Sequence, residues 1–200
     1  MSWILTYSGV RFDLRMPTAA MIRPIDIAHA LSHVARFNGH TAVHYSVAQH
    51  SLLVCDLVQD PALKLQALLH DATEAYVGDM VRPLKEVLPE YRQVEARIWQ
   101  AVCEHFGLEE QLAPEVKHAD LVALATERRD LMPADPVEWP CLQGIEPHPE
   151  KLLALPSWTI RDRYFQRLLE LMHTTHRARV LSTWERVDEN HTGATAPQCL

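Results

Sequence analysis

Acidic side chains and a histidine follow an apolar segment in the stretch ALLHDATEAYVGD, residues 67–79. His70 and Asp71 are adjacent, Glu74 follows one helical turn later, and Asp79 ends the run. A carboxylate buried without a partner is costly, so acidic groups normally stay inside a protein only when they are paired or bound to a metal. The stretch contains no Lys or Arg that would neutralise these acids, and it therefore predicts a metal site.

Further ligands are expected on neighbouring helices. His50 is in step with the apolar residues of its own segment, and Asp120 lies four residues before Leu124, which marks the inward face of another segment. Neighbours such as His70 and Asp71 diverge by about 100° around a helix axis, yet both can reach an ion placed between them. Imidazole favours transition metals over Ca or Mg. The sequence therefore predicts one divalent transition metal (Mn, Co, Fe, Ni or Zn) held by His50, His70, Asp71 and Asp120.

Amphipathic helices are expected to position these residues. Apolar side chains recur at helical spacing in segments whose ends are marked by Pro or Gly in several cases. The predicted helices span 25–37, 44–60, 61–76, 89–107, 113–132 and 157–180. Prolines make residues 133–157 irregular, and the first residues resemble a short hairpin or turn. We predict an all-α, single-domain helical bundle over residues 1–180 and a flexible polar tail over 181–200.

The bulk composition argues against several functional classes. The net charge of -7 disfavours a nucleic-acid polymer as partner, because surfaces that bind one carry a basic excess. The chain contains no GxGxxG motif or P-loop, and no apolar run approaches the roughly 20 residues of a membrane-spanning helix. Its four cysteines are far apart and form no CxxC pair. We expect a soluble, cytoplasmic protein whose ligand is a small molecule and which binds no membrane.

Longer stretches of the chain resemble a known family. They are RFNGH (36–40), YSVAQHS (45–51), ALLHDATEAYVGDMVRPLK (67–85) and KHADLVALATERRDL (117–131). They carry the H…HD…D pattern of the HD-domain metal-dependent phosphohydrolases and are most similar to the YfbR/YfdR-type branch, which includes 5′-deoxynucleotidases. The resemblance covers roughly residues 1–180. It implies an HD-domain bundle, a homodimer, and hydrolysis of the phosphate ester of deoxyribonucleoside 5′-monophosphates at a metal bound by His50, His70, Asp71 and Asp120.

The resemblance also implies two catalytic roles. Glu74 matches an acidic residue that positions or activates the attacking water. Asp79 matches a residue near the sugar and the reacting phosphate. A general base must lie within hydrogen-bond distance of the water that it orients. The structure should therefore place both carboxylates beside the metal ligands.

Residues around the substrate are implied in the same way. Arg36 matches an arginine that contacts phosphate, and Lys85 matches a lysine after the loop that follows the HD helix. Phe37 stands where 5′-deoxynucleotidases place a tryptophan against the nucleoside. His40 follows in the same loop, where a phosphate contact and a structural turn are both compatible with the sequence. Gln49 replaces a glutamate that commonly precedes the first histidine, so a carboxylate behind the metal ligands is expected to be absent.

Other interpretations remain open at this point. Similar HD proteins remove the whole triphosphate from deoxynucleoside triphosphates, so a triphosphohydrolase that releases tripolyphosphate is the second candidate. A non-catalytic regulatory protein that binds nucleotide and metal is a candidate from another class. The run Glu127–Asp130 is most simply a solvated, internally paired helix face, although Glu127 and Arg128 could support a dimer or the site. His29 and His33 are interpreted as a half-exposed pair, and His118 is rejected as a ligand.

Overall fold

A short hairpin opens the chain, and helices form most of the rest of the computed structural model, which describes residues 2–192 and the side chains up to residue 175. Strand β1 (Trp3–Leu5) pairs with β2 (Arg11–Asp13) in antiparallel register. Phe12 of β2 is buried and stacks on Tyr76 with ring centroids 3.8 Å apart, which holds the hairpin against the helices. The predicted all-α, single-domain fold with a short N-terminal hairpin is confirmed.

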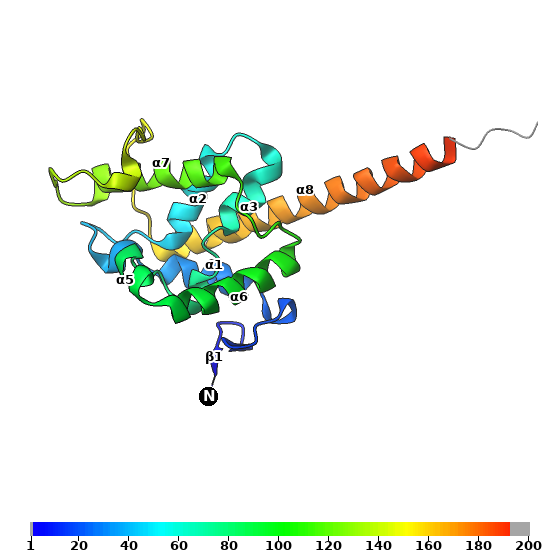
Figure 1. Ribbon diagram of the computed structural model, residues 1–200, viewed down its shortest axis with the longest axis horizontal. Coiled ribbons are helices and arrows are strands. Elements are labelled where there is room, and N and C mark those ends of the chain that lie inside the picture. Colours follow the sequence, from blue (N-terminus) through cyan, green and yellow to red (C-terminus); the bar gives the residue numbers. More distant parts are fainter. Residues whose placement is uncertain (1, 193–200) are drawn as a thin grey trace, which may run out of the picture.

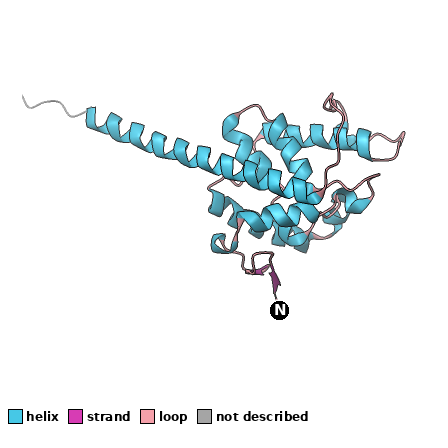
Figure 2. Cartoon of the chain, turned by 180° about the vertical axis from the view of Figure 1, so that it is seen from behind, coloured by secondary structure: helices cyan, strands magenta, loops and turns pink. Residues whose placement is uncertain are grey.

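Figure 1 shows the helices in chain order. The longer ones are α1 (Pro24–His33), α2 (Val47–Leu57), α6 (Pro89–Phe106), α7 (Pro114–Leu131) and α8 (Ser157–Thr192). The shorter α-helices are α3 (Lys64–Leu69), α4 (Glu74–Val77) and α5 (Arg82–Val87). Single 3-10 turns lie at η1 (Ala19–Met21), η2 (Arg36–Gly39), η3 (Pro61–Leu63) and η4 (Pro140–Leu142). Figure 2 shows from behind that loops and these short turns connect the helices.

Local sequence signals explain several helix ends. The hydroxyl of Ser46 accepts a hydrogen bond from the Gln49 backbone N–H and so caps the start of α2, the helix that carries His50. Pro89 and Pro114 occupy first helical positions, where a missing N–H costs nothing. Gly107 ends α6 in the left-handed conformation, with φ of 64°, which glycine adopts without a steric penalty.

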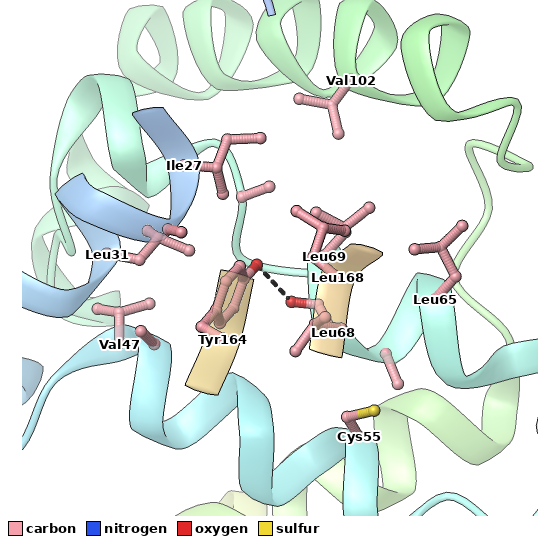
Figure 3. Close-up of a cluster of buried hydrophobic side chains, with 14 of the residues drawn as sticks. Ile27, Leu31, Val47, Cys55, Leu65, Leu68, Leu69, Val102, Tyr164 and Leu168 are labelled. Atoms are coloured by element: carbon pink, nitrogen blue, oxygen red, sulfur yellow. Dashed lines mark hydrogen bonds between the residues drawn. The ribbon is translucent and has the colours of Figure 1, made fainter. Parts of the chain in front are cut away.

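The core lies where α1, α2, α3, α6 and α8 meet (Figure 3). Leu31 of α1, Val47 of α2 and Leu69 of α3 are fully buried there, next to Val102 of α6. Tyr164 of α8 is also fully buried, and its hydroxyl donates a hydrogen bond of 2.9 Å to the Leu68 carbonyl oxygen near the end of α3. This bond and the apolar packing fix the last turn of α3, from which the His70–Asp71 pair projects.

The predicted helix over 61–76 is interrupted in the structure, and this difference affects the site. Helix α3 ends at Leu69, and a tight turn leads from His70 to the start of α4. In this turn the Ala72 N–H bonds to the Leu69 carbonyl at 2.9 Å and the Glu74 N–H bonds to the Asp71 carbonyl at 3.0 Å. These bonds join residues three apart, which winds the backbone more tightly than an α-helix does.

The C-terminal region also differs from the prediction. Helix α8 runs to Thr192, so residues 181–192 are helical where a flexible tail was predicted. The chain has no Gly or Pro from residue 181 until Gly193, so nothing in this stretch interrupts the helix. Figure 1 shows the second half of α8 extending beyond the other helices. Residues 193–200 of the predicted tail lie outside the described part of the chain.

The connections before α6 and after α7 are short or irregular. The predicted helices leave residues 77–88 unassigned, and residues 82–87 form α5, with Pro83 in its first turn. Of residues 133–157, predicted to be irregular, 140–142 form the turn η4 and Ser157 begins α8. Among the described residues, no helix combines the length and the apolar character needed to cross a membrane.

Candidate metal centre

Ligand atoms from three parts of the chain meet at a common point. The Nε2 atoms of His50 and His70 lie 3.3 Å apart, and Asp120 Oδ1 lies 3.1 Å from the first and 3.8 Å from the second. The ligand atoms of these three residues all lie within 4.8 Å of one another. Ligands about 2.0–2.2 Å from one ion lie roughly 3.3–3.6 Å apart when the arrangement is tetrahedral, close to the separations found here. The three residues therefore form a possible metal-binding site.

Asp71 lies beside the same three residues. Its Oδ2 atom is 3.3 Å from His70 Nε2 and 3.5 Å from His50 Nε2. The tight turn after α3 explains how two adjacent side chains face the same point. All four residues predicted as metal ligands therefore meet in the structure, and the role of Asp71 as the fourth ligand stays a prediction.

The donor set fits a cation because of how the two imidazoles are held. His50 Nδ1 lies 2.6 Å from Glu127 Oε1, and His70 Nδ1 lies 2.7 Å from the Ala67 carbonyl oxygen. Both partners are acceptors, so each Nδ1 carries a hydrogen, and each ring in its neutral form would present its Nε2 lone pair to the centre. Metal-bound histidines are typically held in this way by a carboxylate or a backbone carbonyl. Two lone pairs and two carboxylates then face one another, which is stable only around positive charge.

The electrostatics of the cluster lead to the same conclusion. Burial and the Arg36 guanidinium lower the pKa of His50, but the Glu127 and Asp120 carboxylates outweigh them and raise it to about 10. Burial lowers the pKa of His70 as well, and the carboxylates of Asp71 and Asp120 raise it above its ordinary value. The centre therefore favours positive charge, carried by protons or by a bound ion.

Glu127 is the main residue for which the simplest sequence interpretation is wrong. That interpretation placed it on a solvated helix face, with support of a dimer or of the site as the alternative, but its side chain is 0% exposed. Its Oε1 accepts from His50 Nδ1, and its Oε2 accepts from Arg36 Nη2 at 3.0 Å. Glu127 lies seven residues after Asp120, two helical turns along α7, so it shares the inward face with that ligand. This spacing is the signal that could have identified it.

Gln49 has a different role from the one expected. Its side-chain nitrogen donates to the Leu153 carbonyl oxygen, and its side-chain oxygen accepts from the Leu155 N–H at 3.1 Å. It therefore ties α2 to the segment that leads into α8. The carboxylate behind His50, expected to be absent because of Gln49, is supplied by Glu127 of α7.

Arg36 and Asp79 lie next to the centre and contact each other. Arg36 Nη1 is 3.4 Å from Asp79 Oδ2, and both side chains are nearly buried. Burial raises the pKa of Asp79, although Arg36 opposes this shift. Arg36 therefore links Asp79 to Glu127, which in turn holds His50.

Glu74 and Lys85 form a second group at the centre. Glu74 is buried, and its Oε1 lies 3.5 Å from the Lys85 ammonium, which is bound more closely to Glu95 at 2.7 Å. The other oxygen of Glu74, Oε2, is buried and has no hydrogen-bond partner among the described residues. Burial, followed by the negative charges of Asp71 and Asp79, raises the pKa of Glu74 well above its ordinary value. A buried carboxyl group with a raised pKa is suited to exchanging a proton with a neighbouring group.

The remaining predicted residues are Phe37, in the turn η2, and His40, directly after it. Phe37 has a positive φ of 54°. The Arg36 guanidinium carbon lies 5.2 Å from the centre of the Phe37 ring, and the centres of the Phe37 and Trp139 rings are 6.3 Å apart. His40 is exposed, and its side chain forms no hydrogen bond or ion pair with the described residues. The structure therefore brings Glu74, Asp79, Arg36 and Lys85 to the ligand cluster, but does not bring His40 there.

Comparison with known proteins places the chain among its relatives. No family model matches it. It is 46% identical over 145 residues to the uncharacterized protein YfdR of Escherichia coli (strain K12), across 72% of this chain and 81% of that protein. It is 42% identical over 127 residues to the uncharacterized protein RCAP_rcc00048 of Rhodobacter capsulatus, across 59% of this chain and 65% of that protein. The extent and identity of the first match show that the chain belongs to the same family as YfdR.

Proposed function

We propose that the protein is an HD-domain phosphohydrolase that uses one divalent transition metal (Mn, Co, Fe, Ni or Zn) to hydrolyse the phosphate ester of deoxyribonucleoside 5′-monophosphates. The observation that carries this proposal is the pair of histidine Nε2 atoms facing two carboxylates, with both Nδ1 atoms already bonded to acceptors. The resemblance in sequence supplies the substrate class and the expectation of a homodimer.

The chemistry follows from the residues around the cluster. When bound, a divalent ion would lower the pKa of a water molecule and draw charge from a phosphoryl oxygen. His50, His70, Asp71 and Asp120 would hold that ion. Glu74 supports a hydrolytic reaction in particular, because its buried Oε2 has no hydrogen-bond partner among the described residues and would accept a hydrogen bond from the attacking water. Once ionised beside a bound cation, the carboxylate would also take the proton of that water.

The cations near the ligands would bind the phosphate. Arg36 and Lys85 lie on two sides of the acidic group, each held by two carboxylates. Fixed positive groups stabilise the charge that develops on phosphoryl oxygens without having to reorganise during the reaction. Asp79, held by Arg36, would face the sugar next to the reacting phosphate.

A product assay tests this function. The purified protein is loaded with Mn or Co, and dAMP and dATP are offered in separate reactions. Orthophosphate and deoxyadenosine from dAMP, with dATP unchanged, are the expected products. Tripolyphosphate from dATP, with dAMP unchanged, would instead establish a triphosphohydrolase. Stoichiometric metal without phosphate release from any deoxynucleotide would refute hydrolysis and indicate a regulatory binding protein. Asp71→Ala serves as the inactive control for background phosphatase.

A further inference from the structure

A cleft of about 310 Å³ adjoins the metal centre on its α6 side. Two of the predicted metal ligands form one end of the cleft, and α6 and the segment after it form the other walls. The lining residues that matter are His70, Asp71, Arg92, Ala96, Trp99 and Leu112. A group bound at His70 and Asp71 would therefore have this space directly beside it.

We propose that this cleft binds the nucleobase of the substrate, with the Trp99 ring as its aromatic wall. The inference rests on the proposed function, because a phosphate held at the metal leaves the rest of a deoxynucleotide to be accommodated next to the ligands. Ligand clefts in proteins range from about 300 to 1,000 Å³. The volume of this one is at the lower end of that range, which suits a single nucleoside.

Trp99 is held in place as a flat surface. Its indole N–H donates a hydrogen bond of 2.8 Å to the Glu110 carbonyl oxygen, and its ring packs partly against the core. Because the N–H is already bonded, Trp99 offers a ring face to a ligand and no free donor. Ala96 and Leu112 add apolar surface beside it. Such walls accept the π-face of any base, because stacking does not depend on its hydrogen-bonding groups.

Arg92 distinguishes this cleft from the rest of the site. The nearby cations Arg36 and Lys85 are each paired with two carboxylates, and Glu95 is occupied by Lys85. Arg92 lines the cleft and is exposed, and its side chain has no ion pair or hydrogen bond among the described residues. A guanidinium only donates hydrogen bonds. It therefore favours a base with two adjacent acceptors, as guanine has in O6 and N7, over adenine.

Phe37 does not line this cleft. Its ring lies 5.2 Å from the Arg36 guanidinium carbon and 6.3 Å from the Trp139 ring, and Trp139 does not line the cleft either. The structure thus separates two aromatic surfaces, one at Phe37 and one at Trp99, and only the second shares a cleft with His70 and Asp71.

The first test detects binding without catalysis. Deoxyguanosine has no phosphate, so its binding does not depend on hydrolysis. The indole N–H resonances of the protein are followed by NMR during a titration, and Trp99→Phe identifies the Trp99 signal. The expected result is a saturable shift of that signal. Ala96→Leu, which fills the cleft from an exposed helical position, should weaken binding about fivefold or more. A Trp99 signal that does not move, or binding weakened by Phe37→Ala and not by Ala96→Leu, would overturn the proposal.

The second test uses turnover. With dGMP, Ala96→Leu should raise KM about fivefold or more and change kcat less. Arg92→Ala should remove a preference for dGMP over dAMP, whereas Arg97→Ala, an exposed arginine on α6 outside the cleft, should keep it. An unchanged KM in Ala96→Leu would refute binding of the base in this cleft and would leave the proposed hydrolase function standing. A shift of the Trp99 signal in a protein without turnover would support the cleft and refute the hydrolase function.

Discussion

Replacing Glu127 with glutamine is the most informative single change outside the predicted ligands. The two carboxylate oxygens serve different partners, since Oε1 accepts from His50 Nδ1 at 2.6 Å and Oε2 accepts from Arg36 Nη2 at 3.0 Å. Glutamine has nearly the same shape, but one of its two terminal atoms is a donor. In Glu127→Gln an NH₂ group must therefore face either the imidazole N–H or the guanidinium. One buried donor loses its acceptor.

The magnitude follows from the burial of the group. Glu127 and His50 are both 0% exposed, and removing one partner of a buried charged pair typically costs about 3–5 kcal/mol. Glutamine retains one acceptor, so we expect a loss of about 3 kcal/mol in the free energy of unfolding. The hydrogen bond also orients His50 toward the metal, and loss of such a bond lowers metal affinity about 10- to 100-fold.

Two measurements check this prediction. Urea unfolding of the metal-free protein at neutral pH gives the stability, and competition with a chromogenic chelator gives the metal affinity. Glu104→Gln removes the same charge from an exposed position on α6 and should change the stability by less than about 0.5 kcal/mol. A Glu127→Gln variant with wild-type stability and wild-type metal affinity would refute the role of Glu127 in holding His50.

The stability difference between wild type and Glu127→Gln should also depend on pH, and the pKa of Glu127 gives its direction. Burial raises the pKa of Glu127, but His50 and Arg36 outweigh burial and lower it below its ordinary value. A lowered pKa in the folded state means that the carboxylate stabilises the fold above the unfolded-state pKa of about 4.3. This contribution disappears as pH falls through the lower, folded-state value. The stability difference between wild type and Glu127→Gln should thus shrink in acid. Because Glu127 also raises the pKa of His50 to about 10, the difference should shrink again as pH rises from about 6.5 toward 10.

Three further predictions concern other parts of the molecule. Asp71→Ala should abolish both metal binding and hydrolysis, as measured by metal content and phosphate release, and unchanged turnover would contradict the assignment of this ligand. Gln49→Ala should lower the free energy of unfolding by about 0.5–1.5 kcal/mol in urea, because the exposed Leu153 carbonyl and the part-buried Leu155 N–H lose their partner; no loss of stability would contradict this link. The Arg129 side chain lowers the pKa of Asp130 to about 2. Asp130→Asn should therefore lower the free energy of unfolding by about 1 kcal/mol at neutral pH. Urea unfolding at several pH values should show this difference disappearing between about pH 4 and pH 2. A difference that persists in acid would refute the Arg129–Asp130 pair.

The sequence predicted the ligand cluster because each ligand carries its own local signal. His50 and Asp120 occur in step with apolar residues, which places them on inward helix faces whatever the exact helix ends are. Their meeting with His70 then requires only that the helices pack together. The break between α3 and α4 was not predicted, because the residues from His70 to Thr73 contain no Gly or Pro to mark it.

The environment of the cluster was harder to predict, because it depends on pairings between distant segments. Glu127 bonds to His50, 77 positions away, and to Arg36, 91 positions away. Inside the run Glu127–Asp130 its charge looked like that of a solvated surface group. Gln49 likewise finds its partners more than 100 positions along the chain. No local pattern determines which distant backbone or side chain a polar group will meet.

The central claim is that His50, His70, Asp71 and Asp120 hold one divalent ion. Crystals of the protein grown with Co or Mn allow the most direct measurement, which is an anomalous difference map collected at the absorption edge of that metal. We expect a single strong peak within about 2.0–2.2 Å of both Nε2 atoms and of oxygens of both aspartates. A map with no peak at these residues, or with its strongest peak elsewhere, would contradict this metal site.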